Sequence, residues 1–211
     1  MNIRWLGHSA FLITTGAGVS VLTDPYDSYV GCRMPSAAPD IVTVSHDHED
    51  HNCLEAVSGS PCVLRGGDVY DKGGLSVSSV HTFHDSEKGR LRGDNFAFVF
   101  KADGLTLCHM GDVGEFVPEL FRPFDIDVLM LPVGGKYTVD GNTAYRYVEQ
   151  LKPSLVLPMH FKTPYCNFAI DGADVFLARF NKENVFYADI LQPELYLKKG
   201  CTRVAVMNFK A

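Results

Sequence analysis

The densest group of residues able to do chemistry lies at positions 46–51, which read His-Asp-His-Glu-Asp-His. Imidazole nitrogens and carboxylate oxygens are the ligands that zinc, manganese and iron take in hydrolytic sites. A solvated polar loop would explain the acids but not the histidines, because histidine has no preference for turns. The spacing His-x-His-x-Asp-His, formed by His46, His48, Asp50 and His51, therefore predicts a metal site.

The segment that must position this group is residues 41–44, a run of β-favouring side chains directly before it. A strand here would carry the backbone to the edge of a sheet. The tight loop that follows could then direct several side chains at one point. We therefore expect the metal site where this strand ends.

The ligand pattern resembles the signature of the metallo-β-lactamase superfamily. The resemblance implies an α/β (α+β) fold, a four-layer αββα sandwich in which helices flank two mixed β-sheets. It also implies one or two metal ions at the edge between the sheets. Three further ligands should then follow in a fixed order: a histidine, an aspartate that bridges the metals, and a last histidine.

Two histidines, His81 and His84, compete for the first of these places. In the metal-dependent hydrolases that the chain resembles, the ligand is followed by an Asp, a Gly and then Arg-Gly-x-Asn. Here Asp85, Gly89 and residues 92–95 supply that register, which favours His84. His81 lies three residues earlier and would point differently on a strand, where side chains alternate between the two faces.

The other two places are matched by Asp112 and His160. Asp112 follows an expected strand at residues 105–110, and glycines near it would let the backbone approach a metal cluster. His160 follows an expected strand at residues 155–157. Without the upstream motif, a Gly-Asp turn and a lone histidine would carry no such meaning. His109 should face away from Asp112, and we interpret it as structural.

The resemblance implies two divalent metal ions, most simply zinc, with manganese or iron as alternatives. One would be held by His46, His48 and His84, the other by Asp50, His51 and His160, and both by Asp112. Two such cations, about 3.5–4 Å apart, lower the pKa of a bridging water toward 7 and make hydroxide available. Asp50 would also orient that hydroxide. The chain has no Gly-x-Ser-x-Gly nucleophile motif.

Several residues are predicted to support the site. Asp24, after an expected strand at residues 19–22, would hold the metal-binding loop by hydrogen bonds, or else simply begin an Asp-Pro turn. His8 lies in a Gly-His-Ser segment similar to one in proteins resembling L-ascorbate-6-phosphate lactonase and the N-acylphosphatidylethanolamine phospholipase D. It would line the mouth of the site or be a structural histidine. Tyr137 lies in a loop expected to border the substrate.

Positive side chains lie beside three of the site motifs: Lys88, Arg90, Arg92, Lys136 and Lys162. An anion approaching an acidic protein needs local positive charge. The pattern therefore predicts an anionic substrate that carries a phosphate or carboxylate. The alternative is that these side chains are solvated, or that Arg92 only fixes its own loop.

Composition limits the function further. The 211 residues, 46% hydrophobic and 21% charged, fit one globular domain spanning residues 1–211. No apolar run is long enough for a membrane span, and no signal peptide is visible. The six scattered cysteines are typical of reduced thiols in a cytoplasmic protein. The net charge of −6 argues against nucleic acid as a partner. Homo-oligomer formation is left open.

Among members of the superfamily, secreted β-lactamases usually lose a ligand or replace the Gly-Asp acid with cysteine. RNA-processing members carry long insertions or basic arms. The remaining expectation is a hydrolase that attacks an ester, lactone or phosphodiester of a small molecule. Two alternatives stay open: an iron-containing oxidoreductase, which would need an electron partner, and a non-catalytic metal-binding protein, which loss of a ligand would mark.

Overall fold

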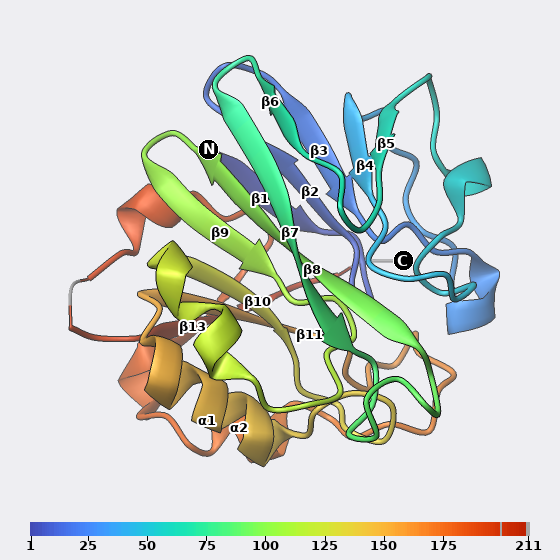
Figure 1. Cartoon of the computed structure of the whole chain (residues 1–211). Helices are drawn as coiled ribbons and strands as arrows, with labels where there is room; N and C mark the ends of the chain where they lie inside the picture. The colour runs from blue at the N-terminus through green and yellow to red at the C-terminus, as the bar shows by residue number, and fades with distance from the viewer. Residues whose placement is uncertain (199, 210–211) are drawn as a thin grey trace.

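Two mixed β-sheets packed face to face form the centre of the computed structural model, which describes residues 1–198 and 200–209 (Figure 1). The smaller sheet has the order β1-β2-β3-β4-β5. Its first three strands are antiparallel, and β4 and β5 run parallel to β3. The strands are β1 (Asn2–Trp5), β2 (Phe11–Thr14), β3 (Ser20–Thr23), β4 (Ile41–Thr43) and β5 (Cys62–Leu64).

The larger sheet has the order β12-β13-β11-β10-β9-β8-β7-β6. Neighbouring strands are parallel from β12 to β9 and antiparallel from β9 to β6. Its strands are β6 (Tyr70–Lys72), β7 (Leu75–Phe83), β8 (Asp94–Ala102), β9 (Leu105–His109), β10 (Val128–Pro132), β11 (Leu155–Met159), β12 (Val185–Ala188) and β13 (Arg203–Met207).

The main core lies between the two sheets. Ile3 and Phe11 of the smaller sheet meet Phe98 and Phe100 of the larger one there. These side chains recur at every second position, as expected for strands with one face in the core. By contrast, β10 and β11 are buried along their whole length, which explains why their sequences are almost continuously apolar.

The outer face of the larger sheet is covered by α1 (Gly141–Leu151) and the short α2 (Asp174–Leu177) (Figure 1). The α1 helix begins where the Asp140 carboxylate accepts a hydrogen bond from the Thr143 N–H at 2.7 Å. It ends at Lys152, just before Pro153. Short 3-10 turns complete this layer and the C-terminal part: Pro118–Leu120, Arg122–Phe124, Lys182–Asn184 and Pro193–Leu195.

The outer face of the smaller sheet is covered differently. Buried side chains such as Tyr26 and Val30 pack against it from a long segment that holds the 3-10 turns Ser28–Val30 and Leu54–Ala56. The predicted fold class is confirmed, but within residues 1–198 and 200–209 this outer layer contains no α-helix. The sequence predicts a short helix at residues 52–57 and another at 171–180, but the structure has only the 3-10 turn Leu54–Ala56 in the first segment and the short α2 in the second. No helix in the described part of the chain is long and apolar enough to cross a membrane.

Candidate metal centre

The predicted metal ligands lie just beyond strand ends at one shared edge of the two sheets. The β4, β7, β9 and β11 strands each end immediately before a segment that carries ligands. Donor atoms of His46, His48 and His84 lie within 4.8 Å of one another, as do those of His46, His51 and Asp112. A further group within the same limit contains Asp50, His51 and His160 together with His8.

Asp112 is the centre of this cluster. Its Oδ2 atom lies 3.1 Å from His160 Nε2, 3.3 Å from His51 Nε2 and 3.4 Å from His84 Nε2. Its other oxygen, Oδ1, is buried without a hydrogen-bond partner. The Asp112 N–H donates to the side-chain oxygen of Asn95 at 2.8 Å, which fixes the backbone of the Gly-Asp turn.

Asp24 holds the loop of predicted ligands, residues 45–51, in place by hydrogen bonds. This buried carboxylate accepts hydrogen bonds from the Ser45 N–H at 2.8 Å and the Ser45 hydroxyl at 2.6 Å. It lies 2.9 Å from His51 Nδ1. Burial acts to raise the pKa of Asp24, but the hydrogen bond from His51 and the nearby His109 hold it below its usual value. Asp24 is therefore an ionised acceptor, and His51 Nδ1 carries the hydrogen.

The same network determines the tautomer of His46. Its Nδ1 lies 2.9 Å from the Ser45 hydroxyl oxygen, whose only hydrogen is already donated to Asp24. The hydrogen between His46 and Ser45 must therefore sit on His46 Nδ1. In their neutral forms, His46 and His51 thus both direct an Nε2 lone pair into the cluster, and both Nε2 atoms are buried without a hydrogen-bond partner.

This arrangement fits a metal ion. Burial holds the pKa values of His46 and His84 below the usual range, so both imidazoles are neutral. Burial also acts to raise the pKa of Asp112, but His160 and His51 outweigh it and hold that pKa well below its usual range. Burial acts to lower the pKa of His51, but Asp112 and Asp50 outweigh it and hold that pKa well above its usual range, so the centre of the cluster attracts positive charge. A divalent cation would supply that charge, and these donors are the ones that transition metals prefer.

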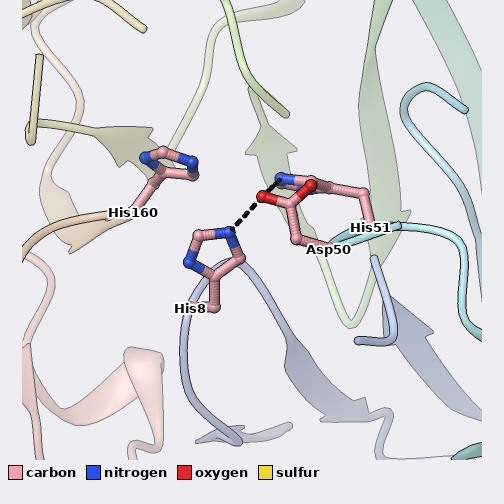
Figure 2. A group of neighbouring side chains, drawn as sticks. All are labelled: His8, Asp50, His51 and His160. Carbon is pink, nitrogen blue, oxygen red and sulfur yellow. Dashed lines mark hydrogen bonds and ion pairs between the residues drawn. The ribbon is translucent and has the colours of Figure 1, made fainter. Parts of the chain in front are cut away.

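His8 forms part of the cluster wall. Figure 2 shows its ring beside His160 and facing Asp50, with 4.3 Å between the His8 and His160 ring centroids and 3.1 Å from His8 Nε2 to Asp50 Oδ2. Burial lowers the pKa of His8 to about 4. The ring is therefore neutral, and its Nε2–H donates to the Asp50 carboxylate. The structure thus places His8 inside the site.

Three non-glycine residues of the site have left-handed backbone conformations: His8, Asp24 and His160, with φ of 51°, 40° and 49°. Such residues cost roughly 1–3 kcal/mol each and persist where the surroundings hold them firmly. Each has its side chain fixed in the cluster or directly beneath it. The strain therefore lies where functional side chains are positioned.

The remaining histidines lie outside the cluster. His81 is half exposed on β7, and its Nε2 lies 2.7 Å from an Asp94 carboxylate oxygen on the neighbouring strand. His109 is buried, and its Nε2–H donates to the Ser9 carbonyl at 2.8 Å. The sequence predicts a strand at residues 75–80, but β7 continues to Phe83, so that His84 is the first residue after it.

Asp85 and Asn95 belong to the sequence pattern that favoured His84, and the structure shows what each of them does. Asp85 accepts hydrogen bonds from four backbone N–H groups of residues 87–92 and so closes the turn after His84. Asn95 donates to Thr82 and to the Met110 carbonyl while it accepts from Asp112. The register therefore corresponds to a hydrogen-bonded frame around His84 and Asp112. Ser45 carried no signal of its own in the sequence.

A cleft of about 490 Å³ opens in front of the cluster. Five of the predicted ligands line it: His48, Asp50, His84, Asp112 and His160. The same cleft is also lined by Tyr29, Arg92, Tyr137 and Phe168. Tyr137 was predicted to border the substrate. Tyr29 lies in the 3-10 turn Ser28–Val30 and Phe168 in an irregular loop, both without periodicity or motif, and no sequence signal indicated them.

The two lysines predicted to face the substrate differ in the structure. Lys162 does not line the cleft, because its ammonium group donates to the backbone carbonyls of Cys166 and Phe168. Lys136 is exposed, with its Nζ 5.4 Å from the ring centroid of Tyr137. Arg92 approaches the same ring at 5.5 Å and lines the cleft. Its side chain, and not that of Lys162, brings positive charge to the site.

Known proteins are similar to this chain in sequence and in fold. The profile of the beta-lactamase superfamily domain matches residues 2–160. A UPF0173 metal-dependent hydrolase from Thermococcus kodakarensis is 31% identical, over 77% of this chain and 85% of that protein. A solved structure from Thermotoga maritima, assigned to the Zn-dependent hydrolases of the metallo-β-lactamase superfamily, is 32% identical with a TM-score of 0.80 and covers 99% of each chain. The chain therefore belongs to the metallo-β-lactamase superfamily, in the family of UPF0173 metal-dependent hydrolases.

Proposed function

We propose that the protein is a hydrolase with two divalent metal ions that cleaves an ester, lactone or phosphodiester bond of a small, anionic substrate. One observation carries the proposal. Nε2 atoms of His51, His84 and His160 converge on one oxygen of Asp112 at 3.1–3.4 Å in a buried cluster that opens into a cleft. A merely structural histidine would instead pair each ring nitrogen, as His109 does.

The donor atoms divide into two groups around Asp112. His46, His48 and His84 would hold one ion, Asp50, His51 and His160 the other, and Asp112 would contact both. Bound divalent cations supply Lewis acidity, which lowers the pKa of water and withdraws electron density from a substrate oxygen. The mixture of imidazole and carboxylate donors supports zinc, with manganese and iron as alternatives.

The protein's own groups supply orientation. Asp24 and Ser45 hold His46 and His51 in the tautomer that leaves the Nε2 lone pair free to bind a metal ion. His8 donates to the Asp50 carboxylate and so fixes it at the cleft floor, where it can orient the attacking water. Positioning of this kind reduces the entropic cost of bringing the water to the substrate.

The test is reconstitution of activity. Protein stripped of metal with a chelator should hydrolyse no substrate in a panel of aryl esters, lactones and phosphodiesters, and added zinc or manganese should restore turnover of one class. Asp112→Asn keeps the shape of the side chain but loses its charge. It should reduce turnover more than about 100-fold, which exceeds the loss expected when a residue that only supports a metal ligand is changed. Equal turnover with and without metal would reject the proposal.

A further inference from the structure

Three aromatic rings form a continuous wall that starts at the metal cluster. The Phe168 ring lies 5.5 Å from the His8 ring and 5.5 Å from that of Tyr29, both measured between centroids. On its other side, Tyr137 lies 6.3 Å away. All three contacts are edge-to-face, which is a favoured geometry for aromatic pairs. Apolar ring surface therefore faces the cleft next to the predicted ligands.

The backbone holds this wall in place. The Lys162 ammonium group donates to the carbonyl of Phe168, which ties the loop that carries the ring. The Asn167 N–H donates to the Val30 carbonyl at 2.7 Å, joining this loop to the one that carries Tyr29. Gly31 permits the close approach, because a Cβ atom there would lie 2.4 Å from the Tyr165 carbonyl oxygen. The wall is therefore formed before any ligand binds, which lowers the entropic cost of binding.

Two positively charged side chains lie close to the Tyr137 ring. The Arg92 guanidinium lies 5.5 Å and the Lys136 ammonium 5.4 Å from its ring centroid. Neither side chain makes a hydrogen bond or an ion pair with any residue in the described ranges, 1–198 and 200–209. Nearby cations such as Arg65 and Arg90 are instead paired with acids. Arg92 and Lys136 are thus available to bind an anion.

We propose that this wall is the recognition site for a flat apolar ring that bears an anionic group. The ring would pack against Phe168, Tyr29 and Tyr137, while Arg92 and Lys136 bind the anion. The wall determines only which molecules are held beside the cluster. This inference therefore rests on the proposed function for the reaction that such a molecule undergoes. The cleft volume of about 490 Å³ suits a small molecule.

Aromatic rings also attract organic cations, so the sign of the ligand charge needs its own argument. Two acids, Asp47 and Glu49, line the cleft beside the ligands. The Asp47 carboxylate already accepts hydrogen bonds from Asn52 at 2.8 Å and Arg65 at 3.3 Å, which leaves Glu49 alone. Two uncommitted cations outweigh one carboxylate, and bound divalent metals would add further positive charge. The balance favours an anion.

The experiment measures binding of inert probes to zinc-loaded protein by calorimetry. Terephthalate has a flat ring and two carboxylates, and trans-cyclohexane-1,4-dicarboxylate has the same charges without a flat ring. The cationic probe, 4-(trimethylammonio)benzoate, keeps the flat ring and one carboxylate but carries a quaternary ammonium group in place of the second carboxylate. Terephthalate should bind about threefold to tenfold more tightly than the cyclohexane probe, as expected for one aromatic contact. It should also bind more tightly than the cationic probe.

Variants assign the two effects. Phe168→Leu should remove the preference for the flat ring and keep the preference for the anion. Arg92→Gln should remove the preference for the anion and keep the preference for the flat ring. Tyr187→Leu, an exposed aromatic position on β12, and Arg90→Gln, which is paired with Glu87, are the matched controls and should change neither preference. Thermal unfolding of each variant separates loss of recognition from loss of the fold.

Tightest binding of the cationic probe would overturn the proposal in favour of a cation cage. Equal affinities for all three probes, or variants that behave like their controls, would show that the wall does not select ligands. These outcomes are independent of turnover. Failure of the proposed hydrolase would appear instead as zinc-loaded protein that turns over no substrate of the panel, or as turnover that does not depend on metal, with the probe preferences unaffected.

Discussion

At the scale of single residues, the site depends on a carboxylate that need not touch a metal. Asp24 accepts from the Ser45 hydroxyl and from His51 Nδ1, and through Ser45 it also fixes His46. Each link leaves one Nε2 lone pair directed at Asp112. The sequence pattern predicted that Asp24 would hold the metal-binding loop, but the relay through Ser45 depends on the hydroxyl geometry, which no spacing rule contains.

Asp24→Asn should weaken metal binding about 10- to 100-fold, the usual cost of altering a partner of a ligating histidine. The amide replaces one acceptor oxygen with a donor, so that either the Ser45 N–H loses its hydrogen bond or the Ser45 hydroxyl and His51 both lose theirs. Competition with a fluorescent zinc chelator measures the affinity. Ser45→Ala should cause a smaller loss, because it disconnects His46 only. Asp103→Asn, at a remote turn where the carboxylate accepts from the Gly16 N–H, is the control and should leave the affinity unchanged. Wild-type affinity in Asp24→Asn would disprove the relay.

His84→Ala should lose metal, and His81→Ala should retain it. The His84 Nε2 lies 3.4 Å from Asp112, whereas His81 faces Asp94 on the surface of the larger sheet. Elemental analysis of both variants, expressed and purified in the same way, gives the number of metal ions per chain. The reverse result would move the ligand to His81.

At the scale of elements, the sequence predicted the strand ends that carry the ligands best. It predicted least well the loops that carry the aromatic wall of Phe168, Tyr29 and Tyr137. Apolar runs such as residues 128–132 identify buried strands, and the ligands follow directly from where these strands end. The sequence predicts strands at residues 75–80 and 96–100, but β7 and β8 extend further, because antiparallel pairing continues through polar residues such as His81, Thr82 and Asn95. The position of Phe168 instead depends on hydrogen bonds between two irregular loops.

Lys162→Met should loosen the loop at residues 163–168 without affecting metal binding. The substitution keeps a long apolar side chain but removes the donor to the Cys166 and Phe168 carbonyls. Amide hydrogen exchange should become faster in this loop and remain unchanged in β11, and zinc affinity should equal that of the wild type. Lys152→Met, at the end of α1, is the control. Unchanged exchange in the loop would show that Lys162 does not hold it.

At the scale of the whole molecule, the cluster joins the two sheets. His46, His48, Asp50 and His51 follow β4 of the smaller sheet, while His84, Asp112 and His160 follow strands of the larger one. The resemblance to a known family gave this architecture, including the order of the ligands along the chain. It did not reveal that the outer layer of the smaller sheet is made of loops and 3-10 turns, because short apolar segments such as residues 54–57 do not distinguish a helix from a turn.

Removal of metal should lower the thermal stability of the protein, since a ligand that binds only the folded state stabilises it. At a free zinc concentration about 1,000 times the Kd, the gain is about 4.1 kcal/mol. For a chain of this size that corresponds to a rise in Tm of roughly ten degrees. Differential scanning calorimetry of stripped and reloaded protein measures the shift. His81→Ala should show the full shift and Asp112→Asn a much smaller one; equal Tm values for stripped and loaded wild type would contradict a metal site that joins the sheets.

The most direct test of the proposed dinuclear centre is anomalous X-ray diffraction from crystals of the zinc-loaded protein, recorded on both sides of the zinc absorption edge. Two strong anomalous peaks are predicted on either side of the Asp112 carboxylate, one beside His46, His48 and His84 and the other beside Asp50, His51 and His160. No peak at Asp112, or peaks only at surface histidines such as His81, would contradict the assignment of this cluster as the metal centre.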